Sequence, residues 1–336
     1  MSWQRIIGHQ PVIDAFQRAR ARGRLAHAYL FTGPAGVGKR LFAGELAKAI
    51  LCESDANRDK IEACDQCPAC ALVDAGTHPD WQALARPEDK NVVPIELMQE
   101  LCQTFALKSA RGKGKVAILD DADDLSAEAA NCFLKTLEEP PLGSIFILVG
   151  SSPERQMATI RSRCQLVRFR PLDAEAMNAW FDQHGIESHQ RARLTKLSGG
   201  SPGQALALAD PELWTFRQSL LTALSQPQPD AVALSKSWME FIEEAGKDTA
   251  AQRRRCHLVL QLLMAFLEDA LAVSLADLEK PAGEDAVFLA DFCRRVSEET
   301  ILAMLDRCLE AEFHLDRYVQ LALAVESLVD ALTASA

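Results

Sequence analysis

The feature that most constrains the fold is a glycine-rich heptad, GPAGVGK, at residues 33–39. It follows the apolar run 28–32 and precedes apolar residues at helical spacing, which is the strand–loop–helix context of a phosphate-binding P-loop. Glycines let backbone N–H groups turn inward around a phosphate, and the helix N-terminus adds partial positive charge. The alternative is a loop that has kept this fold and lost its nucleotide. The predicted phosphate-binding residues are Gly33, Gly36, Gly38 and Lys39.

The residue after the heptad, Arg40, departs from a working P-loop. A Ser or Thr at this place supplies the hydroxyl that ligates Mg²⁺, and a guanidinium cannot ligate a cation. Asp120 ends the apolar run 115–119 and takes the place of the carboxylate that holds Mg²⁺ through water; a simple polar turn is the alternative. Asp121 stands where ATPases usually carry a glutamate. We therefore predict that metal-assisted phosphoryl transfer is badly impaired, even if nucleotide binds.

Strand-like runs and helical periodicity alternate through the first half of the chain, the pattern of a parallel sheet covered on both faces. After 170–172 the pattern changes to short helices, and from Pro211 onward it indicates long amphipathic helices alone. We therefore predict an α/β core in residues 1–168, a small helical domain in 169–208 and an all-α domain in 209–336. The expected strands are 28–32, 81–85, 115–119, 144–149 and 165–169.

Four of the ten cysteines have the spacing of metal ligands. Cys64, Cys67 and Cys70 follow one another at two-residue gaps, and eleven residues separate Cys52 from Cys64. Four thiolates form a closed, tetrahedral structural zinc site, so we predict an inserted zinc module at about residues 52–70. Free core cysteines and redox Cys-x-x-Cys chemistry are the alternatives, and His78 is the one plausible substitute ligand. The other cysteines are scattered singly, which fits a reducing compartment.

Composition is that of an ordinary globular protein, with 48% apolar and 25% charged residues among 336. The net charge of −11 is uneven, because residues 1–208 carry equal numbers of acidic and basic side chains and 209–336 carry twice as many acidic as basic. The acidic third repels a phosphate backbone and disfavours a DNA-binding surface there. We see no apolar run of about 18 residues and no signal-peptide pattern at the start, so we expect a cytoplasmic protein without membrane contact.

Three further motifs carry a family resemblance. The stretch NCFLKTLEEPP at 131–141 and the triplet Ser162-Arg163-Cys164 resemble motifs of the clamp-loader subunits, which are AAA+ proteins. The stretch AGTHPD at 75–80 is similar to the delta-prime family of bacterial DNA polymerase III in particular. Motifs cover about residues 3–208, and the rest matches only as an all-helical tail. The resemblance implies an α/β AAA+ P-loop core, a small helical lid, an all-α C-terminal collar in a circular pentamer, and Cys52 as the fourth zinc ligand.

The resemblance also implies a function. The ATPase members of the family carry an arginine in a Gly-Ser-x-Arg pattern of the lid, and here Gly203 stands in its place. Together with Arg40 and Asp121, this loss implies a stator of the polymerase holoenzyme that binds ATP weakly if at all and has no independent catalysis. The implied partners are the delta subunit and the gamma/tau ATPases, with the sliding clamp and primer–template DNA as cargo. Arg163 is then expected to act in trans as an arginine finger on a neighbouring subunit's nucleotide.

Two other functions remain as alternatives, an autonomous ATPase of the gamma/tau kind and a zinc-dependent DNA-binding module on a relic core. Arg40 and Gly203 argue against the ATPase. The acidic tail argues against the DNA-binding module, as do the short basic clusters at 18–24, 108–115 and 253–255. Steady-state ATP hydrolysis by the isolated chain, and its salt-dependent DNA binding, distinguish the three.

Overall fold

A computed structural model describes residues 2–54, 60–87, 90–226, 228–276 and 285–335 of the chain. It divides into two compact units, residues 1–206 and 207–336. The first unit contains the sheet and the short helices that follow it, and the second is helical. The further boundary near residue 168 stays a prediction, and residues 55–59 of the predicted zinc module lie outside the described residues.

The five strands form one parallel sheet in the order β2-β3-β4-β1-β5. The predicted strand positions are confirmed, except that β2 and β5 each end one residue earlier than expected. Because parallel strands end at the same edge of a sheet, β1 and β3 deliver the P-loop and Asp120 to that edge, where ligands of open α/β sheets bind. The strands are β1 (Ala28–Thr32), β2 (Trp81–Leu84), β3 (Lys115–Leu119), β4 (Ser144–Val149) and β5 (Gln165–Arg168).

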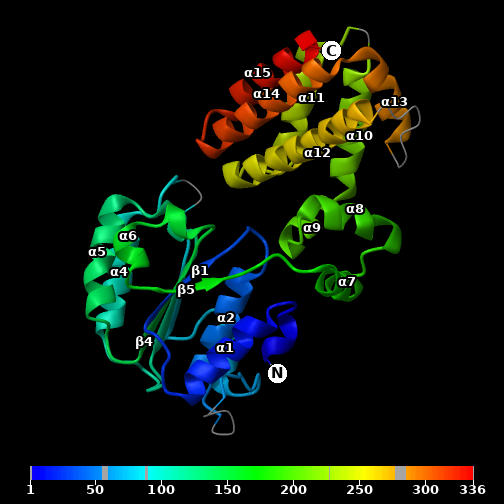
Figure 1. The fold of residues 1–336 in the computed structure, drawn as a ribbon. Helices are drawn as coiled ribbons and strands as arrows, with labels where there is room; N and C mark the ends of the chain where they lie inside the picture. Colours follow the sequence, from blue (N-terminus) through cyan, green and yellow to red (C-terminus); the bar gives the residue numbers. More distant parts are fainter. Residues whose placement is uncertain (1, 55–59, 88–89, 227, 277–284, 336) are drawn as a thin grey trace. The chain divides into compact units, whose positions relative to one another are not determined.

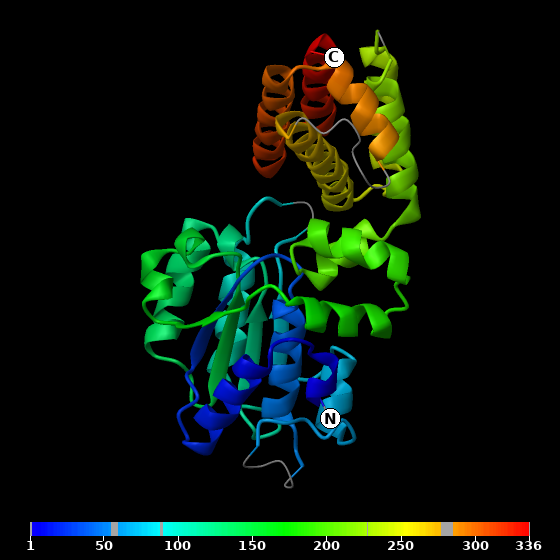
Figure 2. The same ribbon diagram turned by 45° about the vertical axis from the view of Figure 1, so that its right-hand side comes forward.

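Helices cover both faces of the sheet (Figures 1 and 2). Alternate residues of β1 divide between two cores, because successive side chains of a strand point to opposite faces. Tyr29 and Phe31 belong to one core with residues of α1 and α2, and Leu30 belongs to the other with residues of α4 and α5. The covering helices are α1 (Gln10–Ala21) and α2 (Lys39–Leu51) on one face, and α4 (Ile95–Ala106) and α5 (Ala127–Glu138) on the other.

Local sequence signals set the ends of several helices in this unit. The Ser126 side chain accepts a hydrogen bond from the Ala129 N–H at 3.1 Å, as expected for the N-cap of α5. That helix ends at Glu138, just before the predicted stop at Pro140. The remaining helices that start in this unit are α3 (Pro68–Asp74), α6 (Ala158–Arg161), α7 (Ala174–Gln183), α8 (Ser188–Ser198) and α9 (Pro202–Leu208), together with the 3-10 turns at Ser2–Arg5, Ala122–Asp124 and Pro153–Arg155.

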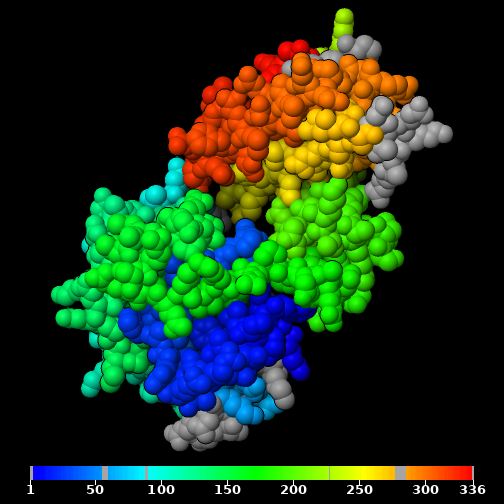
Figure 3. All heavy atoms as spheres, viewed as in Figure 1, coloured from blue at the N-terminus to red at the C-terminus, as the bar shows by residue number. Residues whose placement is uncertain are grey.

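The second unit is a helical bundle organised around α12, which packs against α10, α11, α13 and α14; Figure 3 shows α12 beside α14 in yellow and orange-red. Arg217 is buried in it and bonds both carboxylate oxygens of Asp285, at 2.8 and 2.6 Å. Its helices are α10 (Pro211–Leu224), α11 (Ala231–Glu243), α12 (Thr249–Leu275), α13 (Ala286–Arg295), α14 (Glu298–Asp316) and α15 (Leu321–Ser335).

One helix among the described residues, α12, is long and apolar enough to cross a membrane by length and composition. The sequence expectation concerned an uninterrupted apolar run, and α12 has none of that length, because Gln261, Glu268 and Asp269 interrupt its apolar residues. The same criteria are met by a helix at the centre of a helical bundle, and α12 is such a helix. It buries Val259, Leu263 and Phe266 almost completely in the core of the second unit.

Candidate nucleotide site and metal centre

The glycine-rich heptad forms a tight loop between β1 and α2. Gly33, Gly36 and Gly38 have φ angles of 144°, 74° and 102°, which L-residues with side chains rarely adopt. A side chain at Gly33 would also meet the carbonyl oxygen of Phe169 at 2.2 Å. The structure therefore gives the three predicted glycines the backbone conformation that a phosphate-binding loop needs.

Lys39 begins α2 and turns back onto the loop. Its ammonium group donates hydrogen bonds to the carbonyl oxygens of Gly33 and Pro34, at 2.6 and 2.7 Å. Burial lowers the pKa of Lys39, and the nearby carboxylates of Asp120 and Asp123 oppose that shift. The predicted phosphate-binding cation is thus held inside the loop next to the carboxylates at the end of β3.

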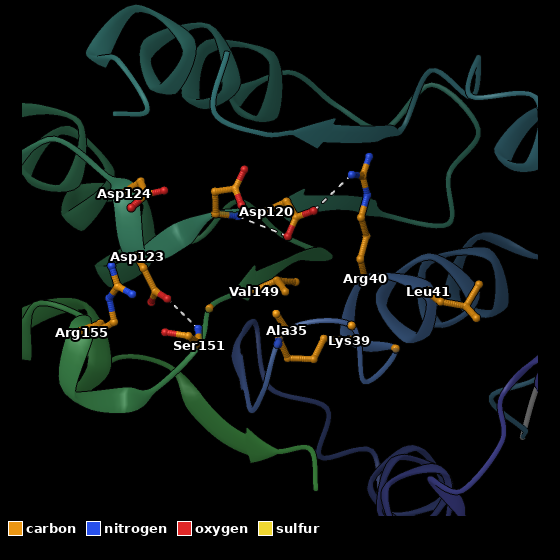
Figure 4. A pocket seen from close by; sticks show the side chains of 14 residues that line it. Ala35, Lys39, Arg40, Leu41, Asp120, Asp123, Asp124, Val149, Ser151 and Arg155 are labelled. Atoms are coloured by element: carbon orange, nitrogen blue, oxygen red, sulfur yellow. Dashed lines mark hydrogen bonds and ion pairs between the residues drawn. The ribbon is translucent and has the colours of Figure 1, made fainter. Parts of the chain in front are cut away.

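Arg40 and Asp120 form an ion pair that the sequence did not predict. Arg40 lies in the first turn of α2 and Asp120 follows β3, and the Arg40 Nη1 and Asp120 Oδ2 atoms are 3.3 Å apart (Figure 4). Burial raises the pKa of Asp120, the neighbouring Asp121 raises it further, and Arg40 opposes both effects. Arg40, which replaces the hydroxyl residue of an active P-loop, therefore pairs its positive charge with Asp120, the carboxylate predicted to hold the metal.

A pocket of about 460 Å³ opens beside this pair. Its far wall contains Asp123, which accepts hydrogen bonds from the Ser151 N–H at 2.6 Å and the Gln156 side-chain amide at 2.8 Å, and Arg155, which Figure 4 shows beside Asp123. These residues were not predicted from the sequence as part of the site. Asp123 had a signal in the run of aspartates after β3, but Arg155 comes from a turn after β4 and had none.

Mg²⁺, the metal of P-loop ATPases, does not fit the residues present. The loop lacks the hydroxyl ligand, and the Arg40 guanidinium already pairs with the Asp120 carboxylate. The loop itself does fit a phosphate chain, since its glycines have the required conformation and Lys39 lies within it.

Gly203, which stands where the resemblance places the lid arginine of the ATPases, packs closely against the P-loop. It lies in the first turn of α9, and its N–H donates to the Gly36 carbonyl oxygen at 2.9 Å. The hydroxyl of Ser201, two residues earlier, donates to the Ala35 carbonyl oxygen at 2.8 Å. A Cβ atom at Gly203 would lie 2.8 Å from the Gly36 Cα, so this position has no room for any side chain.

Gly203→Ala is therefore expected to destabilise the protein, although alanine favours a helix. The new methyl group meets backbone that cannot move aside, and overpacking of this kind costs about 1–3 kcal/mol. Gly44→Ala is the matched control, because Gly44 lies inside α2 with open space around its Cα and should gain up to about 1 kcal/mol. Urea denaturation followed by circular dichroism measures both, and equal midpoints for the two variants would contradict the prediction.

The four predicted cysteines come together in space. Their sulfur atoms all lie within 4.8 Å of one another, and the Cys52 and Cys67 sulfurs are 4.0 Å apart. A tetrahedral zinc site with Zn–S bonds of about 2.3 Å has sulfurs about 3.8 Å apart, so the cluster is close to that geometry. Burial opposes thiolate formation at Cys67, but hydrogen bonds from backbone N–H groups, including that of Cys70, lower its pKa to about 7. The cluster is able to hold a metal ion.

A buried lysine attaches the cysteine loop to the P-loop helix. Lys48 of α2 lies 2.8 Å from Asp65, 3.1 Å from Asp74 and 3.3 Å from Glu45. Asp65, between Cys64 and Cys67, has a φ of 57°. Burial alone would lower the pKa of Lys48, but its carboxylate partners raise it. The buried Lys48 side chain therefore joins the cysteine loop to α2 through carboxylates that remain partly exposed.

His78, the substitute ligand considered from the sequence, is not part of the cysteine cluster. Its Nδ1 atom accepts a hydrogen bond from the Asp80 N–H at 3.0 Å. The Asp80 carboxylate in turn accepts from the N–H groups of Ala110 and Arg111, at 2.7 and 2.8 Å. The AGTHPD motif thus holds a neighbouring loop in place.

Arg163 lies just after α6 and interacts within its own unit. Its guanidinium pairs with the Glu138 carboxylate and donates to the Thr159 carbonyl oxygen at 2.9 Å. The side chain remains about one-third exposed. The residue thus forms the surface ion pair that is the simple alternative to a finger role, and its role toward another subunit stays a prediction.

The fold and the site together define an AAA+ type protein, with a P-loop after β1, an aspartate after β3 and lid helices that follow β5. The family model described as "DNA polymerase III, delta subunit" matches residues 8–173. The DNA polymerase III subunit delta' of Escherichia coli is 34% identical over 77% of this chain and 75% of its own. That of Bacillus subtilis is 27% identical over 98% of both chains.

A DNA polymerase III subunit tau from Escherichia coli is 32% identical over 61% of this chain and 32% of its own. The chain belongs to the delta-prime family of DNA polymerase III subunits, which are clamp-loader components, as the sequence motifs predicted.

Proposed function

We propose that this chain is a non-hydrolysing stator of the clamp loader, which helps to place the sliding clamp on primed DNA. The observation that carries the proposal is the Arg40–Asp120 ion pair, because it removes the metal position from the nucleotide site. Gly203 supports it, since it stands at the lid position where the ATPases of the family carry the arginine that contacts a nucleotide's phosphates. The gamma/tau type of ATPase is disfavoured by the same residues.

The proposed partners are the delta subunit and the gamma/tau ATPases, in a hetero-pentamer joined through the helical unit 207–336. The cargo is the sliding clamp and primer–template DNA. Contact with DNA is assigned to the whole complex, because residues 209–336 are strongly acidic. A cytoplasmic location follows from this role. In the complex, Arg163 is proposed to act as an arginine finger on a neighbouring subunit's nucleotide.

Zinc is the proposed occupant of the four-cysteine cluster. Four thiolates without an open position favour Zn²⁺ in a structural role. Cys52, Cys64, Cys67 and Cys70 would hold it, and Lys48 would connect their loop to the helix that follows the P-loop.

The isolated chain is expected to hydrolyse ATP negligibly, far below the typical enzymatic rate of about 1 s⁻¹. Arg40→Thr alone should not restore turnover, because the lid arginine and the catalytic glutamate are also missing at Gly203 and Asp121. A coupled phosphate-release assay with Mg²⁺, DNA and clamp present measures the ATP turnover of the wild-type chain and of Arg40→Thr. Wild-type turnover near 1 s⁻¹ would contradict the proposed function.

A further inference from the structure

The charges of the P-loop pocket differ from those of a metal-dependent nucleotide site. In such a site, the carboxylate after β3 is neutralised by Mg²⁺, which also bridges the phosphates. Here Arg40 brings the neutralising charge on a side chain, 3.3 Å from the Asp120 carboxylate. The same pocket is lined by two further cations, Lys39 and Arg155. Its carboxylates are Asp120, Asp121, Asp123 and Asp124.

The exposure of the two partners indicates how the pair is oriented. The Asp120 side chain is 19% exposed and the Arg40 side chain is 70% exposed. One end of the guanidinium therefore contacts a mostly buried carboxylate, and much of the side chain is open to solvent at the pocket. A guanidinium has five N–H donors in a planar fork, which also suits phosphate oxygens.

We propose that Arg40 takes the place of the divalent cation, so that this pocket binds the phosphate chain of a nucleoside triphosphate without magnesium. The glycine loop and Lys39 hold the phosphates, and Arg40 bridges them to Asp120. A magnesium ion carried in on the nucleotide would lie close to the guanidinium, and the like charges repel. The pocket would therefore bind a nucleoside triphosphate without hydrolysing it. This inference rests on the same Arg40–Asp120 pair as the proposed function, and it adds that a nucleoside triphosphate is the ligand of the pocket.

Calorimetric titration of ATP into the full chain, once with excess EDTA and once with excess Mg²⁺, tests this inference. For the wild-type chain, we expect the dissociation constant in EDTA to be no larger than in Mg²⁺. For Arg40→Thr, we expect it to be larger in EDTA by about tenfold and to recover on addition of Mg²⁺, because the hydroxyl and the freed Asp120 now suit the metal.

Arg307→Thr is the matched control, since Arg307 pairs with Glu310 on an exposed helix face at 2.7 Å in the other unit and should change neither constant. The inference is contradicted if the wild-type chain does not bind ATP in EDTA. It is equally contradicted if Mg²⁺ tightens wild-type binding about threefold or more, or if Arg40→Thr stays independent of the metal. ATP turnover by the wild-type chain contradicts the proposed function instead, so the two failures are distinguishable.

Discussion

Cys67→Ser is expected to remove zinc from the protein and to unfold the loop that carries the cysteines. The Cys67 sulfur lies 4.0 Å from the Cys52 sulfur. It also accepts a hydrogen bond from the Cys70 N–H at 3.5 Å. A hydroxyl is a poor zinc ligand, and three thiolates leave an open, weaker site. Metal binding to such loops is coupled to their folding and contributes about 10–16 kcal/mol in zinc-finger peptides. A loss of several kcal/mol of stability is therefore expected.

Metal analysis of freshly purified protein, together with thermal unfolding, measures this effect. The wild-type chain should contain about one equivalent of zinc, and the variant less than about one tenth. Cys132→Ser is the control, because Cys132 is a half-buried cysteine of α5 outside the cluster and should leave the zinc content unchanged. Less than about half an equivalent in the wild-type protein would show that zinc is not the occupant.

Arg163→Ala is expected to lower the ATPase rate of the reconstituted clamp loader by about 10- to 100-fold and to leave assembly intact. A finger supplied in trans is worth about 10³–10⁵ in GTPases, and a ring with several sites should show less. Arg163→Lys should be nearly as defective, because lysine lacks the planar fork that contacts several phosphate oxygens. The side chain contributes little to its own unit, since it is partly exposed and its carboxylate partner, Glu138, is about half exposed.

Two control variants separate a finger from a surface ion pair. Arg161→Ala removes an exposed neighbour that donates to the Pro153 carbonyl oxygen, and it should leave the rate unchanged. Glu138→Gln removes the partner of Arg163, and it should leave the rate unchanged or raise it. Native mass measurement confirms assembly of each complex. If the Arg163→Ala complex assembles and hydrolyses ATP at the wild-type rate, the finger assignment is wrong.

Much of the core could be predicted from local patterns. Buried parallel strands are short apolar runs bounded by turn residues, so β1, β3 and β4 were located to the residue. The glycines of the P-loop were equally clear, because the required backbone conformation excludes most other residues. Local patterns did not show that the apolar residues of α12 face the core of a bundle on several sides. A helix buried on several sides has a wide apolar surface, and its character depends on the helices that surround it.

The candidate site was predicted by residue type more than by contact. Arg40 and Asp120 were both identified, one as a departure from the P-loop pattern and the other as a metal-binding carboxylate. That they neutralise each other depends on β3 and α2 meeting at one edge of the sheet, about eighty residues apart in the chain. Arg163 was likewise identified, but its contact with Glu138 joins the segment just after α6 to the end of α5.

The sequence by itself therefore determined the strand positions, the glycine-rich loop, the spacing of the cysteines and the family, because each depends on local backbone preference or on residue types at fixed spacing. The tertiary structure alone decided three further features. These are the pairing of Arg40 with Asp120, the attachment of the cysteine loop to α2 through Lys48, and the contact of Gly203 with Gly36 that excludes a lid arginine. Each is a contact between segments distant in the chain, and chain spacing does not set the distance between such segments.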